Sequence, residues 1–207
     1  MNRTIFLYLI FWAFSLTSLS GFAQECIHTN LSRNIDFKIN IVRNSDTSDF
    51  IHGAKIDLLI YNKHKVLLQK ISFKCEFLLD DAYTNCDNPR SYITGHNKNK
   101  EAPDNDYSDL IIADLNFDGK EDFAIKYDSG GNAGPLYAFY IQQDNMHFKK
   151  GTFLSEKMMF FPLFMDSKSR TLITHSHADA YGYYESTFAY NMKTRKWRRV
   201  EHAYRKA

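Results

Sequence analysis

Apolar residues recur at every second position through most of this chain, and this period most restricts its fold. In segment 34–42 the alternating residues are Ile35, Phe37, Ile39 and Ile41. A period of two predicts β-strands with one face on a core and the other in water. Further strands are expected at 54–61, 71–77, 109–114, 122–127, 136–142, 147–154, 171–178, 183–191 and 196–204.

No stretch after the N-terminal segment has helical periodicity, so the sequence predicts an all-β fold. The expected arrangement is an antiparallel meander, a sandwich or a set of partial propeller-like sheets. A polar stretch at about 80–106, rich in Asn, Asp, Lys and Pro, is expected to be a long loop. No linker divides the rest, so 24–207 is expected to form one domain.

The first 23 residues resemble a signal peptide. They contain an early cation, Arg3, an apolar run over 5–19, and small residues at Gly21 and Ala23. We expect cleavage after Ala23 and a periplasmic or secreted protein. An uncleaved anchor helix is the alternative, since the apolar run approaches the length of a membrane span.

Three cysteines in an exported chain predict a disulfide. Cys75 and Cys86 would close a short loop and are the preferred pair, which leaves Cys26 free. Pairing of Cys26 with either of the others stays open, because connectivity does not follow from sequence.

The segment 114–122, "DLNFDGKED", carries the strongest functional motif. Its oxygen-bearing side chains alternate before a glycine, a spacing that lets them converge on one ion. Calcium takes 6–8 oxygen ligands at about 2.3–2.6 Å. The expected ligands are Asp114, Asn116, Asp118, the carbonyl of Lys120, and Asp122. A metal-free turn rich in Asp, Asn and Gly is the alternative.

The flanking strands separate this motif from the helix–loop–helix calcium site, which also needs a glutamate where this chain has Ile125. It resembles the strand–loop–strand calcium site of FG-GAP repeats. Together with the signal segment and "DSGGNAGPLYAFY", it is similar to bacterial periplasmic FG-GAP-like proteins related to inhibitors and immunity proteins of lysozyme-type peptidoglycan hydrolases. The resemblance covers roughly 109–190.

The resemblance implies a non-enzymatic binding protein whose Ser-Gly loop and nearby tyrosine enter a hydrolase cleft. The corresponding partner-binding residues would be Ser129, Gly130, Gly131, Asn132 and Tyr137. The segment taken alone is a flexible turn between two strands. A structural envelope protein without such a partner is the alternative function.

A second motif, "THSHAD" at 174–179, is close to the metal signature of metallo-β-lactamase-fold hydrolases. Period two would place His175, His177 and Asp179 on one strand face. Ala180 stands where those enzymes need a histidine, and the sequence after Ala180 contains a single histidine, His202. Three ligands do not complete a catalytic zinc centre. A metal-dependent hydrolase that borrows His147 remains the rival hypothesis.

The net charge gives little further direction. The formal net charge is +2, which gives no reason to expect nucleic-acid binding. The basic C-terminal segment 193–207 is expected to be a solvated edge strand.

Overall fold

The computed structural model of this protein describes residues 23–43 and 52–206. Nearly all of its regular structure is strand, which confirms the predicted all-β fold. The expected signal segment lies outside the described residues except for Ala23. Within the described ranges, no helix is long and apolar enough to cross a membrane.

In the part of the chain that the structure describes, thirteen strands form three open sheets. The N-terminal sheet is an antiparallel meander of β1 (Ala23–His28), β2 (Ile35–Arg43), β3 (His52–Asn62) and β4 (Leu67–Leu78). The central sheet contains β5 (Arg90–Ser91), β6 (Leu110–Ala113), β7 (Asp122–Asp128), β8 (Leu136–Gln142) and β9 (Phe148–Lys150). The C-terminal sheet contains β10 (Phe164–Asp166), β11 (Thr171–Asp179), β12 (Gly182–Asn191) and β13 (Lys196–Lys206).

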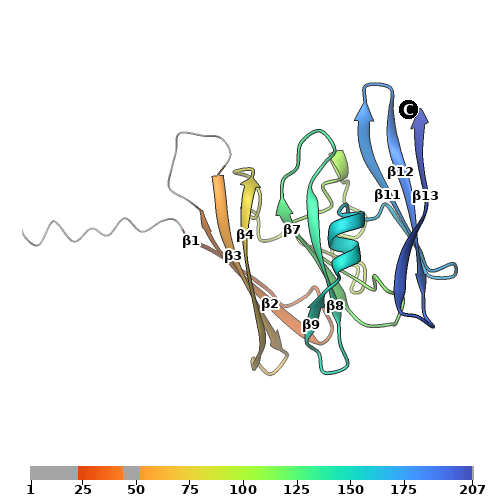
Figure 1. Ribbon diagram of the computed structural model, residues 1–207. Coiled ribbons are helices and arrows are strands. Elements are labelled where there is room, and N and C mark those ends of the chain that lie inside the picture. The colour runs from red at the N-terminus through yellow and green to blue at the C-terminus, as the bar shows by residue number, and fades with distance from the viewer. Residues whose placement is uncertain (1–22, 44–51, 207) are drawn as a thin grey trace, which may run out of the picture.

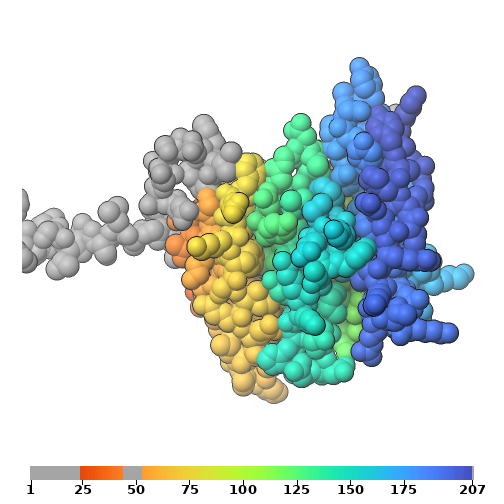
Figure 2. Space-filling view, in the orientation of Figure 1, coloured from red at the N-terminus to blue at the C-terminus, as the bar shows by residue number. Residues whose placement is uncertain are grey.

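The three sheets lie side by side in chain order, with the central sheet between the other two (Figures 1 and 2). Its two faces contribute to two different cores. Leu110 and Ile112 pack in the core shared with the N-terminal sheet. Ile111 and Ala113 pack in the core shared with the C-terminal sheet. Strand β6 is therefore buried at every position, whereas strands of the outer sheets alternate.

The prediction of a strand at 147–154 is wrong for the second half of this segment. Strand β9 ends at Lys150, and the chain continues into a short π-helical turn, η2 (Leu154–Met158). Two hydrogen bonds fix this departure: the Phe139 N–H donates to Ser155 Oγ at 3.0 Å, and the Ser155 N–H donates to the Gly151 carbonyl at 2.9 Å. The turn carries the chain from the central sheet to the C-terminal sheet.

The polar stretch 80–106 is largely a loop, as predicted, interrupted only by β5 and the 3₁₀ turn η1 (Pro103–Asn105).

The expected Cys75–Cys86 disulfide is wrong, because the structure joins Cys26 to Cys86 with their Cα atoms 5.3 Å apart. Cys75 points into the core from β4, where burial, the largest influence, raises the pKa of its thiol to about 12. Cys86 instead lies against β1, where the Gln24 side chain donates to the carbonyl of Thr84 at 2.8 Å. A disulfide is compatible with an oxidising compartment.

Candidate functional site

The predicted calcium loop connects β6 to β7 at one end of the central sheet. Its first carboxylate folds back onto the loop: Asp114 accepts the Asp118 N–H at 3.0 Å and the Gly119 N–H at 2.9 Å. Gly119 has a φ of +84°, a backbone conformation that favours glycine. Asn116 Oδ1 also accepts the Asp118 N–H, at 3.1 Å. The tight turn expected from the sequence is therefore present.

Asp122 is fully buried at the start of β7. Its carboxylate accepts the N–H groups of Leu115 at 2.9 Å, Asn116 at 3.3 Å and Gln142 at 2.8 Å. Burial outweighs these hydrogen bonds and raises the pKa of Asp122 to about 8. Burial also raises the pKa of Asp114. The loop thus holds acidic groups whose charged forms are costly without a cation.

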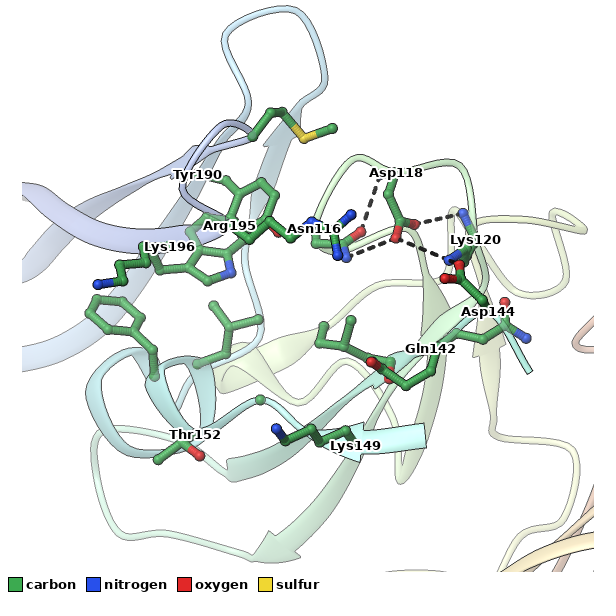
Figure 3. A pocket seen from close by; sticks show the side chains of 17 residues that line it. Asn116, Asp118, Lys120, Gln142, Asp144, Lys149, Thr152, Tyr190, Arg195 and Lys196 are labelled. Atoms are coloured by element: carbon green, nitrogen blue, oxygen red, sulfur yellow. Dashed lines mark hydrogen bonds and ion pairs between the residues drawn. The ribbon is translucent and has the colours of Figure 1, made fainter. Parts of the chain in front are cut away.

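The protein itself supplies one ammonium group to this loop, Lys120 (Figure 3). Lys120 Nζ lies 3.9 Å from Asp118 Oδ2 and pairs more closely with Asp144. No cluster of three or more His, Cys, Asp or Glu side chains within 23–43 and 52–206 is arranged to hold a metal. The loop carboxylates are turned toward backbone amides. The donor set, carboxylates and an amide oxygen, is one that hard cations prefer.

The predicted partner-binding loop follows β7 and is held tightly at its base. The Ser129 N–H donates to the Phe77 carbonyl at 2.9 Å, and Ser129 Oγ accepts the Leu79 N–H at 2.8 Å. Gly130 has a φ of +66°, and a Cβ there would lie 1.9 Å from the Gly134 carbonyl oxygen. Gly131 and Asn132 are exposed at the loop tip.

Tyr137 does not belong to this exposed surface, which corrects its predicted role. Its ring is completely buried and packs in the core beside Phe161, with ring centroids 6.0 Å apart. Its hydroxyl accepts the Tyr107 N–H at 3.2 Å. The alternation along β8 explains the error, because Tyr137 and Phe139 point to the same core.

The histidine motif is divided between two faces of the C-terminal sheet. The β11–β12 register shifts between His177 and Asp179, so a bulge reverses the side-chain alternation there. His175 Nε2 lies 3.0 Å from a carboxylate oxygen of Glu185. Asp179 instead accepts a hydrogen bond from the Tyr204 hydroxyl at 3.0 Å. The expectation that His175, His177 and Asp179 share one face is therefore wrong.

His147, the additional ligand of the rival hypothesis, belongs to a different sheet from the histidine motif. His147 lies in the β8–β9 turn of the central sheet, whereas the histidine motif lies on β11 of the C-terminal sheet.

Two features were not found from the sequence. The first is a buried ion cluster below the 129–134 loop: Lys126 Nζ lies 2.9 Å from both Asp109 Oδ1 and Asp106 Oδ2. The second is a cavity of about 690 Å³ between the calcium loop and the β12–β13 turn, lined in part by Lys149 and Trp197 (Figure 3). The alternating pattern predicts strands, but it does not predict which residues far apart in the sequence form the ion cluster or the cavity.

Comparison of the chain with protein-family models, curated proteins and solved structures gives no match.

Proposed function

We propose that this chain is an exported, non-enzymatic binding protein whose 114–122 loop takes Ca²⁺ and whose 129–132 loop meets a protein partner. The partner we propose is a peptidoglycan hydrolase of the lysozyme type. The observation that carries the calcium proposal is Asp122, a fully buried carboxyl that accepts three N–H hydrogen bonds. The disulfide supports export.

The hydrogen-bond pattern around Asp122 favours its charged form, because all three neighbours are donors. Burial opposes that charge. A bound divalent cation resolves this conflict, since it neutralises the carboxylates without removing the hydrogen bonds. The side chains that would hold Ca²⁺ are those of Asp114, Asn116, Asp118 and Asp122, with the carbonyl of Lys120. The ion would supply rigidity to the β6–β7 connection.

The partner surface that we propose lies at one end of the molecule. The 129–134 loop lies against η1, and Asn105 of η1 donates a hydrogen bond to the His175 carbonyl of β11 at 3.2 Å (Figure 1). Tyr181, Tyr184 and Tyr204 on the adjoining C-terminal sheet are 78%, 42% and 40% exposed. Tyrosine is enriched at protein interfaces. Ser129 Oγ accepts one hydrogen bond from the protein and retains its own proton for a partner carboxylate.

Calcium is expected to raise the melting temperature of the wild-type protein by about 5–10 °C relative to the chelated protein. A ligand at 100 times its Kd adds about 2.7 kcal/mol, and each kcal/mol shifts a domain of this size by about 2–4 °C. Asp118→Ala is expected to abolish this response, because it removes one carboxylate from the ligand set. Differential scanning calorimetry with added Ca²⁺ or chelator measures both effects.

Asp144→Asn is the matched control, because Asp144 pairs with Lys120 beside the loop but is not an expected ligand. It should keep the full calcium response. Equal melting temperatures of the wild type with calcium and with chelator would contradict the calcium proposal.

Substitution at the loop tip is expected to weaken inhibition of a lysozyme-type hydrolase. Asn132→Arg places a bulky cation on the proposed interface and should raise the inhibitor concentration needed for half-inhibition about tenfold, which corresponds to about 1.4 kcal/mol. Asn145→Arg, in the exposed β8–β9 turn, is the control and should inhibit like the wild type. Clearing of a cell-wall suspension by a panel of lysozymes measures the effect. An unchanged rate with every panel member argues against this partner.

A further inference from the structure

We propose that the cavity between the calcium loop and the β12–β13 turn binds a short acidic saccharide. This site lies apart from the 129–132 loop but borders the 114–122 loop, whose Asn116, Asp118 and Lys120 line it. Saccharide binding is proposed both with and without a bound calcium ion. The cavity has a volume of about 690 Å³, within the range of small-molecule sites. Its walls come from the central sheet, η2 and the β12–β13 hairpin (Figure 3).

The cavity lining is positively charged. Four cations line it, against the two carboxylates of Asp118 and Asp144. Among the described residues, Lys120 pairs with both carboxylates. The other three cations are Lys149, Arg195 and Lys196, and they form no ion pair with any residue that the structure describes. A ligand with carboxylate groups would supply the countercharge that they lack.

The remaining lining residues favour a saccharide over an acidic peptide. Trp197 and Tyr190 pack with ring centroids 4.9 Å apart and offer flat apolar surfaces on which a sugar ring can stack. Amide side chains elsewhere in the lining can both donate and accept hydrogen bonds, as pairs of sugar hydroxyls require. These amides are Gln142 and Gln143.

The aromatic wall is fixed in place before any ligand binds. Trp197 also packs against Phe117 of the calcium loop, with ring centroids 6.2 Å apart. The Tyr190 N–H donates to the Arg170 carbonyl at 3.0 Å. On the opposite wall Gly151 has no side chain, and a Cβ there would lie 3.3 Å from Ile141. A site formed in advance loses less entropy on binding.

Fluorescence titration tests the proposal, because Trp12 and Trp197 are the two tryptophans of the chain. The Trp12→Phe variant leaves Trp197 as its one tryptophan, so the emission reports on the cavity whether or not the expected signal segment has been removed. Trigalacturonate, an acidic trisaccharide, is expected to change this emission and to bind at least about tenfold more tightly than neutral chitotriose. Isothermal titration calorimetry gives the two affinities.

Adjacent lysines on β9 provide the matched pair of variants, since Lys149 lines the cavity and Lys150 does not. Lys149→Ala is expected to weaken trigalacturonate binding about tenfold, and Lys150→Ala by less than about twofold. Lys196→Ala, on the facing hairpin, should repeat the effect of Lys149→Ala. Both lysines of β9 are exposed, so neither variant is expected to alter folding.

Three results would overturn the proposal. They are equal effects of Lys149→Ala and Lys150→Ala, tighter binding of hexaglutamate than of trigalacturonate, or no binding of trigalacturonate by the wild type. Titrations with calcium and with chelator separate this proposal from the calcium proposal. The contrast between Lys149 and Lys150 should persist under both conditions.

Discussion

Replacing Lys126 by methionine is expected to lower the free energy of unfolding by about 3–5 kcal/mol, because it leaves a buried carboxylate without its cation. Lys126 and Asp109 are both almost completely buried, with Nζ and Oδ1 2.9 Å apart. Burial acts to lower the pKa of Lys126, but Asp109 and Asp106 outweigh it and the pKa is raised. The ammonium group therefore stays charged inside the protein.

The same ion cluster also connects the polar stretch 80–106 to the central sheet. Asp109 Oδ2 accepts the Tyr83 N–H at 2.8 Å, and the Tyr83 hydroxyl donates to the Lys126 carbonyl. Loss of the Lys126 charge should therefore loosen the 80–106 segment as well as β7. Urea denaturation gives the change in unfolding free energy.

Two controls separate the effect of the buried charge from a general loss of a lysine. Lys126→Met combined with Asp109→Asn should recover most of the lost stability, because the neutral amide still accepts the Tyr83 N–H. Lys55→Met removes an exposed ion pair, 3.8 Å from Asp57, and should cost less than about 1 kcal/mol. Equal losses from Lys126→Met and Lys55→Met would show that the buried pair has no special role.

Cys86→Ser is expected to destabilise the protein by about 4 kcal/mol. The disulfide joins residues 60 positions apart, and closing a loop of that length restricts the unfolded chain by about this amount. Cys86 is exposed, so its replacement leaves the core unchanged. Urea unfolding of the oxidised wild type and of the variant measures the difference.

Cys75→Ala is the matched control for the disulfide. It removes a buried thiol from the core shared with the N-terminal sheet and should lower the free energy of unfolding by about 1 kcal/mol. The Cys26–Cys86 bond should stay intact. Peptide mapping without reductant should recover the linked Cys26 and Cys86 peptides from this variant. A linked Cys75 peptide in the wild type would contradict the assigned pairing.

The alternating pattern was sufficient to predict the class of fold, because each outer-sheet strand has one apolar face. It did not separate the central sheet from the others. Leu110, Ile111, Ile112 and Ala113 are consecutive and all buried, and such a run indicates a strand covered on both faces. That signal was present in the sequence at β6.

The predicted site divides according to the range of the contacts involved. The turn at 114–119 is local, and the residue spacing correctly predicted a sharp turn at Gly119. The burial of Tyr137, the bulge after His177 and the partner of Cys86 depend on how distant segments pack. Residue spacing contains no information on those contacts.

The doubly covered central sheet also has a consequence for synthesis of the chain. The face of the central sheet with Ile111 and Phe139 is complete by Lys150, but its cover, formed by η2, Phe161 and the C-terminal sheet, begins only at Leu154. A nascent chain therefore passes through a stage with a finished apolar surface exposed to solvent, which favours aggregation. Until the C-terminal sheet has formed, this apolar surface is the part of the chain most exposed to intermolecular association.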